Sequence, residues 1–313
     1  MDSKVSIIVA TYRRNDSLKK ALYSLAAQTY KQIEIILVDD NDDLDFSNAV
    51  TQIAESFIND NPDLDFRLIV EHTNLRSAKA RNKGIQAASG EFITFLDDDD
   101  IYLPDKVKRQ LEFMQQNNLD YSITDLFLYN DSDRLIERRL RKYIKYDDSE
   151  NLLKYHFMYH MTGTDTLMFR TAYLKEIGGF DEIDFGDEFY LMKKAICQMG
   201  RFGYLPNCDV KAYVHTSENN LSSGASKISG ENELYEYKKN YFKNLDSKTV
   251  RYIKMRHYAV LAYAHIRMKN YFSFIIDSLK SFFSSPMQCV KLFIGRKYEG
   301  FDFMRSLCRR KRK

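Results

Sequence analysis

The stretch FITFLDDDD, from Phe92 to Asp100, places four consecutive aspartates directly after an apolar run. Carboxylates gathered at one point repel one another, and a carboxylate removed from water without a partner is costly. A divalent cation with oxygen ligands removes both penalties. A solvated acidic turn is the ordinary alternative, but ligands bind at the carboxyl ends of strands in open α/β sheets. The position of the run after a predicted strand therefore favours a ligand site.

Strand-like and helix-like segments alternate on the N-terminal side of this stretch. The apolar patterns predict strands at 5–10, 33–38, 66–70 and 92–96, and helices at 17–28, 47–58, 77–88 and 104–116. Such alternation is typical of a mostly parallel sheet whose two faces are both covered by helices. We therefore expect an α/β fold with a Rossmann-like sheet.

The pattern changes in the second half of the chain. We expect strands at 121–129 and 166–169 and a helix at 187–199, whereas 134–146 is polar and receives no assignment. Residues 217–230 are rich in Ser, Asn and Gly, which predicts a flexible loop. From 231 to 283 the apolar spacing is helical, with aromatic and basic faces. A helical C-terminal appendage is thus expected to follow the sheet.

The net charge of +3 conceals a strong asymmetry along the chain. Residues 232–313 contain 19 Lys and Arg against 6 Asp and Glu, while the remainder contains 28 against 38. A basic end that closes with Arg309–Lys313 suits an anionic membrane surface, nucleic acid or another polyanion. It is equally compatible with a solubilising tail. The acidic front part and the lack of a nucleic-acid motif argue against nucleic acid.

Cysteine usage and hydropathy indicate the compartment. The four cysteines are scattered without metal-ligand or disulfide spacing, which fits a reducing environment. The sequence opens directly on a strand-like run, and no apolar stretch reaches the roughly 20 residues of a membrane span. We expect a cytoplasmic protein with peripheral contact on the inner face of the cell membrane.

Polar residues follow each predicted strand of the first half. They are Thr11, Tyr12 and Arg14 after the first strand, Asp39 and Asp40 after the second, Asn74, Arg76, Arg81 and Asn82 around the third, and Asp97 to Asp100 after the fourth. In a doubly wound sheet these ends line one crevice. Carboxylates for a metal and arginines for phosphate suit a nucleoside diphosphate with a divalent cation. The absence of GxGxxG and GxxxxGK[ST] argues against dinucleotide dehydrogenases and P-loop enzymes.

Five segments occur in order along the chain: VSIIVATYRR, IEIILVDD, NLRSAKARNKGI, FITFLDDDD and GGFDEIDFGDEFYLMKKA. Together they resemble family 2 glycosyltransferases with the GT-A fold, over roughly residues 5–217. In that family they correspond to the first strand with its nucleotide-contacting turn, the second strand, the N-x-G-x-x-x-A-R-N-x-G stretch (with Arg76 at the usual glycine), the DxD metal motif and the segment of the catalytic base. The resemblance implies a catalytic domain at 1–217, with a nucleotide-binding half at about 1–117 and an acceptor half at about 118–217. A flexible loop at 218–230 and a basic, aromatic-rich helical region at 231–313 would follow.

The resemblance also implies roles for individual residues. The expected nucleotide-binding residues are Thr11, Tyr12, Arg14, Asp39, Arg76, Asp97 and Asp98, with Asp39 on the nucleobase. The expected metal ligands are Asp99, Asp97 and His215, with Asp99 in direct contact. Many relatives carry Glu-Asp where this chain has Asp187-Glu188; alignment on Leu191 puts the general base at Glu188, with Asp187 as the alternative. Arg81 is expected to brace the fold beneath the site.

The implied activity is an inverting, metal-dependent transfer of a hexosyl or N-acetylhexosaminyl group. The donor would be a nucleoside-diphosphate sugar, most commonly a UDP-sugar, with GDP- and dTDP-sugars open, and the cofactor Mn²⁺ or Mg²⁺. The acceptor would be a glycan or lipid-linked hydroxyl in surface polysaccharide or glycoconjugate synthesis, and the C-terminal helices would contact the membrane or form a homo-oligomer. The alternatives are a catalytically inactive nucleotide-sugar-binding relative and a sugar-nucleotide pyrophosphorylase, whose glycine-rich loop the ATYRRND turn lacks.

Overall fold

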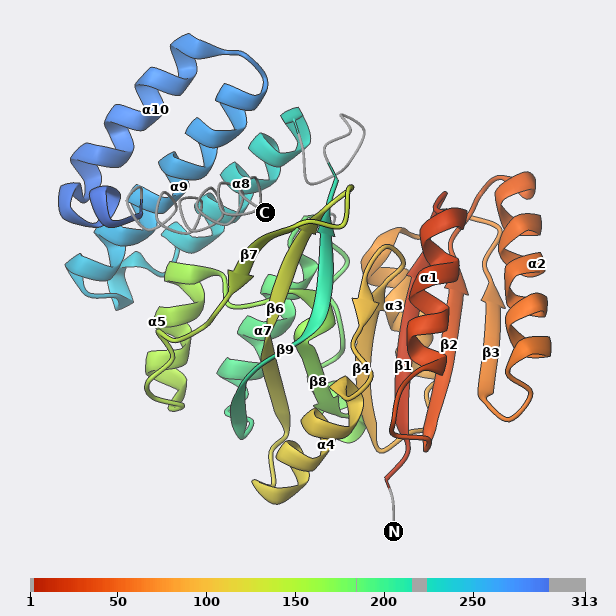
Figure 1. Cartoon of the computed structure of the whole chain (residues 1–313). Coiled ribbons are helices and arrows are strands. Elements are labelled where there is room, and N and C mark those ends of the chain that lie inside the picture. The colour runs from red at the N-terminus through yellow and green to blue at the C-terminus, as the bar shows by residue number, and fades with distance from the viewer. Residues whose placement is uncertain (1–2, 184, 216–223, 293–313) are drawn as a thin grey trace, which may run out of the picture. The chain divides into compact units, whose positions relative to one another are not determined.

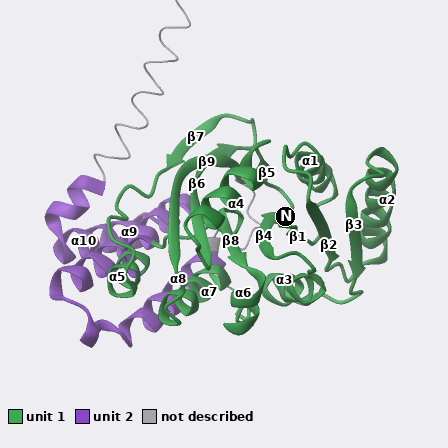
Figure 2. Cartoon of the chain, turned by 90° about the horizontal axis from the view of Figure 1, so that it is seen from below, with its two compact units in different colours: residues 1–156, 160–214 green, residues 157–159, 215–313 purple. Residues whose placement is uncertain are grey.

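The computed structural model describes residues 3–183, 185–215 and 224–292, and the chain divides into two compact units (Figures 1 and 2). The first unit comprises residues 1–156 and 160–214, and the second comprises 157–159 and 215–313. The boundary in sequence is therefore not a single point, because three residues at the end of one helix belong to the second unit.

A nine-stranded mixed sheet forms the centre of the first unit, in the order β3-β2-β1-β4-β8-β6-β9-β5, with β7 paired to β6 (Figure 1). Its strands are β1 (Val5–Thr11), β2 (Ile33–Asp39), β3 (Asp65–Val70), β4 (Phe92–Asp97), β5 (Ile101–Tyr102), β6 (Tyr121–Asn130), β7 (Leu135–Arg139), β8 (Leu167–Arg170) and β9 (Phe202–Val214). The first four strands in sequence are parallel to one another, whereas β8 runs antiparallel to β4. The expected α/β class is confirmed.

Helices cover both faces of this sheet, which explains why β1 and β2 are buried along almost their whole length. The helices are α1 (Asn15–Ala26), α2 (Leu44–Asp60), α3 (Arg76–Ala87), α4 (Lys106–Gln116), α5 (Ser149–Tyr159), α6 (Thr171–Glu176) and α7 (Asp187–Cys197), with a 3-10 turn η1 at Thr164–Thr166. On β1, Ile7 belongs to a core shared with α1, α2 and α4, and its neighbour Ile8 belongs to a second core shared with α3, α6 and α7. Alternate side chains of one strand thus enter two different cores.

The register of the parallel strands fixes where the site forms. Thr11 pairs with Asp39 across β1 and β2, and Ala10 pairs with Asp97 across β1 and β4. Since parallel strands with matched lengths end at the same edge, the polar residues that follow them meet there. The strand ends predicted from sequence are therefore brought together by the pairing itself.

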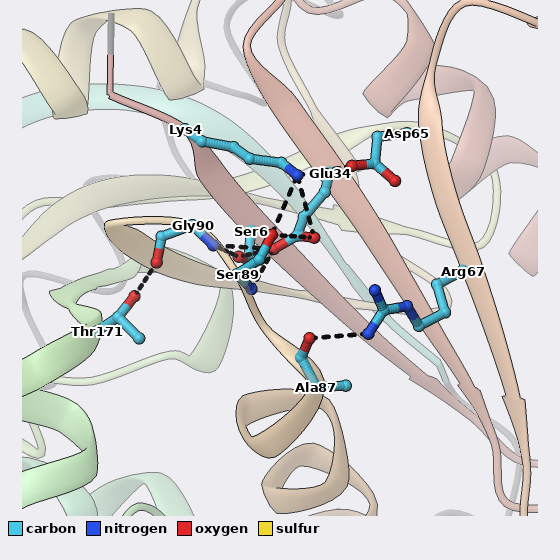
Figure 3. A network of polar contacts seen from close by, with 9 residues as sticks. All are labelled: Lys4, Ser6, Glu34, Asp65, Arg67, Ala87, Ser89, Gly90 and Thr171. Atoms are coloured by element: carbon cyan, nitrogen blue, oxygen red, sulfur yellow. Dashed lines mark hydrogen bonds and ion pairs between the residues drawn. The ribbon is translucent and has the colours of Figure 1, made fainter. Parts of the chain in front are cut away.

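At the opposite end of these strands, Glu34 of β2 organises the turn that leads into β4 (Figure 3). Its carboxylate is almost completely buried and accepts hydrogen bonds from Ser6 Oγ, from the Ser89 N–H at 2.7 Å and from the Gly90 N–H at 3.0 Å. Burial alone would raise the pKa of Glu34, but these hydrogen bonds together lower it to about 2. A side chain at Gly90 would approach Ser6 Oγ to 2.6 Å, so the turn requires glycine.

Two regions of the chain differ from the expectation. The polar segment 134–146 contains β7, and α5 follows it without having been predicted. Helix α8 begins at Gly224, so the expected loop at 217–230 is wrong for residues 224–230; its remaining residues lie outside the described ranges. Tertiary packing has overridden the loop-like composition at this point, since Gly230 is buried within the helix.

The second unit is helical, as expected. It contains α8 (Gly224–Lys239), a 3-10 turn η2 (Phe242–Asn244), α9 (Ser247–Arg267) and α10 (Tyr271–Ser284). Ser281 Oγ of α10 donates to the carbonyl of Met255 in α9 at 2.8 Å, and Phe157 packs edge-on against Tyr241 with ring centroids 5.2 Å apart. Across the described residues, the helices fall short of the length and apolarity that membrane crossing demands.

Candidate functional site

The turn after β1 is tied to the aspartate run by Asp98. Its Oδ2 accepts a hydrogen bond from Thr11 Oγ1 at 2.7 Å and lies 3.4 Å from the Tyr12 N–H. Burial raises the pKa of Asp98 to about 6, against the opposing effects of Thr11 and Arg14. Asp98 therefore connects the ends of β1 and β4, the two strands whose ends were predicted to bind nucleotide.

Asp99 lies beside it and forms an ion pair with Arg14. The Asp99 side chain is 14% exposed and that of Arg14 is 34% exposed, so this pair lies at the surface of the strand ends. A guanidinium close to two adjacent carboxylates is also positioned for a phosphate, because it can exchange one anionic partner for another. The structure thus places Thr11, Tyr12, Arg14, Asp98 and Asp99 in one group.

Asp97, the first residue of the run, faces a different partner. Arg81 Nη2 donates to Asp97 Oδ1 at 2.7 Å, and the Asp97 N–H donates to Asp165 Oδ1, also at 2.7 Å. With 36% of its side chain exposed, Asp97 is the most accessible carboxylate among Asp97, Asp98 and Asp99.

Asp97, Asp100 and Asp165 form a carboxylate group that could hold a metal ion. Oxygen atoms of the three side chains lie within 4.8 Å of one another, and Asp100 and Asp165 are buried. Burial, followed by the nearby Asp165 charge, raises the pKa of Asp100 well above its usual range. Burial and the charge of Asp97 raise the pKa of Asp165 to about 6. Hard oxygen donors that repel one another in this way fit a divalent cation.

The first turn of α7 supplies two carboxylates with different surroundings. Asp187 is buried: its Oδ2 accepts from Arg81 Nη1 at 2.7 Å and from Ser77 Oγ at 3.1 Å. Burial raises the pKa of Asp187 to about 6 in spite of the Arg81 charge. Glu188 has a side chain that is 20% exposed, and its Oε1 lies 2.9 Å from Nε2 of His160. Of the two predicted base residues, Glu188 is the one with access to solvent.

Asp39 and Asp40 organise the turns after β2. Asp39 is fully buried and accepts from Ser47 Oγ at 2.5 Å and from Asn41 Nδ2 at 2.6 Å. Asp40 accepts from the backbone N–H groups of Leu75 at 2.7 Å and Arg76 at 2.9 Å. The structure therefore shows Asp39 holding a turn, and its contact with a nucleobase stays a prediction.

Arg76 begins α3 with a positive φ of 70° and is one of the residues that line a cavity of about 270 Å³. The lining residues are Asn74, Leu75, Arg76, Ala78, Lys79, Glu182 and Ile183. Lys79 and Glu182 form an ion pair at 3.0 Å on this surface. His215 directly follows β9 and belongs to the second unit, so its predicted approach to a metal or diphosphate stays a prediction.

Two residues of the site, Asp165 and His160, were missed by the sequence reasoning. Asp165 lies in η1, between an unassigned segment and a short strand, and the surrounding Thr-Asp-Thr carries no motif. His160 follows α5, a helix that was not predicted. Only the tertiary fold brings them to the ends of β4 and α7.

Comparison with known sequences gives a family match over more than half of the chain. The profile described as Glycosyl transferase family 2 matches residues 6–177. An uncharacterized glycosyltransferase of Rickettsia felis is 37% identical over 137 residues, which are 44% of this chain and 21% of that protein. The UDP-Glc:alpha-D-GlcNAc-diphosphoundecaprenol beta-1,3-glucosyltransferase WfaP of Escherichia coli is 33% identical over 129 residues, 41% of this chain and 47% of that protein. The chain thus spans less than half of the length of these two relatives.

Solved structures show the same fold at low sequence identity. TarS 1–349 of S. aureus in complex with UDP-GlcNAc has a TM-score of 0.56 at 19% identity, covering 90% of this chain and 91% of that one. The mannosyltransferase PcManGT from Pyrobaculum calidifontis in complex with GDP-Man and Mn²⁺ has a TM-score of 0.57 at 17% identity, covering 94% and 79%. The expected GT-A-type fold is confirmed by these neighbours.

Proposed function

Because the chain belongs to the glycosyl transferase family 2, we propose that it transfers a sugar from a UDP-sugar to a hydroxyl group of a glycan or lipid-linked acceptor, with inversion at the anomeric carbon. One observation carries the proposal: Arg81 links a carboxylate of the strand end, Asp97, to the first turn of α7, where Glu188 is partly exposed. These contacts support a single site that combines the proposed donor-binding edge with the proposed base. We propose that this reaction serves the synthesis of a surface polysaccharide or glycoconjugate.

In the proposed reaction Glu188 acts as the general base. The acceptor O–H proton passes to the Glu188 carboxylate while the acceptor oxygen bonds to the anomeric carbon. The bond from that carbon to the diphosphate breaks, and its electron pair leaves with the diphosphate. A hydroxyl is a weak nucleophile, so a placed carboxylate accelerates this step. Asp187 suits the role less, because both Arg81 and Ser77 already donate to its Oδ2 and its side chain is buried.

The leaving diphosphate needs positive charge. Arg14 supplies some of it, since it lies beside Asp99 at the strand ends. When bound, Mn²⁺ or Mg²⁺ would add Lewis-acid stabilisation of the leaving group. Asp97 and Asp99 are the residues that we propose to hold it, with Asp100 and Asp165 as the alternative partners of Asp97 in the carboxylate group.

UDP is the first nucleotide to test. The name of the E. coli relative specifies a UDP-Glc donor and the S. aureus structure contains UDP-GlcNAc, while the P. calidifontis structure contains GDP-Man. GDP and dTDP are therefore the comparison ligands. Thr11 and Tyr12 would receive the nucleotide on the β1 side, and Arg76 would reach the diphosphate from the start of α3.

The decisive experiment is calorimetric titration of UDP, with and without Mn²⁺, into the wild type, Asp99→Asn and Asp165→Asn. We expect metal-dependent binding that is lost in Asp99→Asn and kept in Asp165→Asn; the reverse pattern would assign the metal to the buried carboxylate group. The control is Asp63→Asn, at an exposed aspartate in the turn before β3. Absence of binding by UDP, GDP and dTDP would contradict the proposal, and binding without turnover of any UDP-sugar would favour an inactive nucleotide-binding relative.

We further propose that the second unit binds anionic lipid. Helix α10 and the segment after it expose large apolar side chains at helical spacing: Phe272 (76%), Ile275 (55%), Leu279 (52%), Phe283 (74%) and Met287 (70%). Eight Lys and Arg against two acidic residues follow at 293–313. An apolar stripe combined with a basic segment matches an interfacial helix on a negatively charged bilayer.

Vesicle co-sedimentation tests this lipid contact. The wild type is expected to sediment with phosphatidylglycerol vesicles at low salt and much less with phosphatidylcholine vesicles. The double substitution Phe272→Ser with Phe283→Ser should reduce binding about tenfold or more, given roughly 0.8 kcal/mol per buried CH₂. The control pair replaces Leu44 and Ile136, which are exposed on the first unit. Equal binding by the two double variants would contradict the proposal, and a concentration-dependent mass in light scattering without vesicle binding would indicate a homo-oligomer instead.

A further inference from the structure

His160 and Glu188 form a contact to which no role has been assigned. The two side chains are 21% and 20% exposed, and His160 Nε2 lies 2.9 Å from Glu188 Oε1. An ionised carboxylate can only accept, so Nε2 carries the hydrogen and donates it. We propose that His160 is a positioning residue that holds Glu188 in the rotamer required of the base.

The backbone at His160 is unusual for a residue with a side chain. It follows the last residue of α5 in the left-handed region, with φ 53° and ψ 73°, and its N–H donates to the His156 carbonyl at 2.9 Å. Glycine is the common residue at such a helix end. Residues held in sparsely populated regions cluster at functional sites, where the surrounding structure fixes them. Since His72 has the same φ of 53° away from α7, the contact with Glu188 and not the conformation alone carries the proposal.

The preceding turn of α5 adds a second contact to the same part of α7. His156 is fully buried and stacks on the Phe189 ring, with centroids 4.1 Å apart and an interplanar angle of 21°. Its Nε2 also lies 2.9 Å from the carbonyl oxygen of Phe189. Two histidines four residues apart thus contact consecutive residues of α7. His156 fixes the backbone of the first turn, and His160 fixes the side chain of the base.

The contact with His160 gives the two carboxylate oxygens of Glu188 different roles. Oε1 accepts from His160, so we assign the acceptor hydroxyl to Oε2. A glutamate has one more rotatable bond than an aspartate and loses more rotamer freedom when it is held in place. If the base is already held in its reactive geometry, this loss of entropy does not add to the activation free energy. Loss of His160 should therefore lower kcat and leave donor binding unchanged.

Because this inference rests on Glu188 being the base proposed above, both residues are changed in one experiment. UDP release from UDP-glucose and UDP-N-acetylglucosamine, with water as acceptor, is measured for the wild type, His160→Ala, His160→Gln and Glu188→Ala. We expect His160→Ala to lower kcat about 10- to 100-fold, with donor KM and UDP affinity within about twofold of the wild type. His160→Gln should restore most of kcat, because its amide N–H can donate to the same oxygen.

The matched control is His72→Ala. His72 is an exposed histidine that also has a positive φ, of 53°, so its replacement repeats the backbone change away from α7. Wild-type kcat in His160→Ala together with an inactive Glu188→Ala would overturn the positioning role and leave the base in place. Full turnover by Glu188→Ala would overturn both.

NMR spectroscopy tests the same contact without depending on enzyme activity. Proton–nitrogen spectra of the imidazole groups should show His160 protonated on Nε2 in the wild type. In Glu188→Ala the resonances of His160 Nε2 and of its proton should shift, since the hydrogen-bond acceptor is gone. An unchanged His160 spectrum in Glu188→Ala would show that the two side chains are not in contact in solution, and would refute the positioning role even if His160→Ala fails to fold.

Discussion

The guanidinium of Arg81 joins two carboxylates that are far apart in the sequence. It donates to Asp97 at the end of β4 and to Asp187 at the start of α7, each at 2.7 Å. Burial alone would lower the pKa of Arg81, but Asp187 and Asp97 raise it above its ordinary value. The planar fork of an arginine suits two separate carboxylates, which a lysine could not hold in the same way.

Replacement of Arg81 should be among the most destabilising changes in the first unit. Arg81→Gln leaves the buried Asp187 without its ionic partner, which typically costs about 3–5 kcal/mol. The free energy of unfolding, from urea denaturation at pH 7, measures this effect. Arg67→Gln is the control, because Arg67 is exposed and donates only to the Ala87 carbonyl among the contacts drawn (Figure 3). A loss no larger than that of Arg67→Gln would show that the bridge is not formed in solution.

Single residues were predictable where a strand end carried them. Thr11, Asp98 and Asp99 follow apolar runs whose parallel pairing forces them together, so the sequence was enough to group them. Asp165 and His160 could not be found in this way. Their places depend on how η1 and the end of α5 pack against β4 and α7, and neither segment has a periodic pattern.

Among the elements, the β2–β4 region shows how one buried acid can fix a turn. The Glu34 carboxylate accepts from the two backbone N–H groups of Ser89 and Gly90 and from the Ser89 hydroxyl at 2.8 Å (Figure 3). Thr171 Oγ1 donates to the Gly90 carbonyl at 2.6 Å from the start of α6. The turn that sets the start of β4 is thus held from two sides, and the register of β4 places the aspartate run at the far end.

Glu34→Gln should destabilise the protein by about 1–3 kcal/mol at pH 7. Both carboxylate oxygens of Glu34 accept hydrogen bonds, whereas a glutamine amide has only one oxygen that can accept. The effect should depend on pH. The folded-state pKa of Glu34, about 2, lies below the unfolded value. The carboxylate therefore stabilises the fold fully above about pH 4.3 and loses that contribution as pH falls toward 2.

Urea unfolding at pH 7 and pH 3 measures this linkage. The difference between the wild type and Glu34→Gln should shrink at pH 3, whereas Glu55→Gln, at an exposed position of α2, should match the wild type at both values. A difference that stays constant between the two pH values would contradict the role of the ionised form.

The elements that sequence patterns revealed are the ones with strong periodicity. The four parallel strands and their helices follow from apolar spacing alone, and the structure moves their ends by only a few residues, as for α1 at Asn15–Ala26. Helix α5 was hidden because its neighbourhood is polar. Only the first part of α8, residues 224–230, was hidden, because its glycine and serine are typical of loops, whereas burial of Gly230 favours the helix.

The chain in its entirety combines an acidic first unit with a basic second one, yet its two parts share a helix. Residues 149–156 of α5 belong to the first unit and 157–159 to the second. Within the second unit, Phe157 is fully buried and packs on Tyr241, while Tyr159 packs on Tyr252 with ring centroids 5.1 Å apart.

A chain ended after Val214 should consequently be less soluble than the full chain. It would keep Phe157 and Tyr159 but lose the residues that cover them, and uncovered aromatic side chains promote association. Light scattering of the shortened chain should show aggregates, and Phe157→Ser with Tyr159→Ser should suppress them. Monomeric behaviour of the shortened chain without these substitutions would contradict this expectation.

The shared helix also limits how such proteins can be recombined. A chimera that takes its C-terminal helices from another protein would keep this chain's 157–159 and pair them with foreign surfaces. The three residues would have to travel with the helices that they contact, although more than fifty positions separate them in the sequence. We therefore expect residues 157–159 to change together with the helices of the second unit when related sequences diverge.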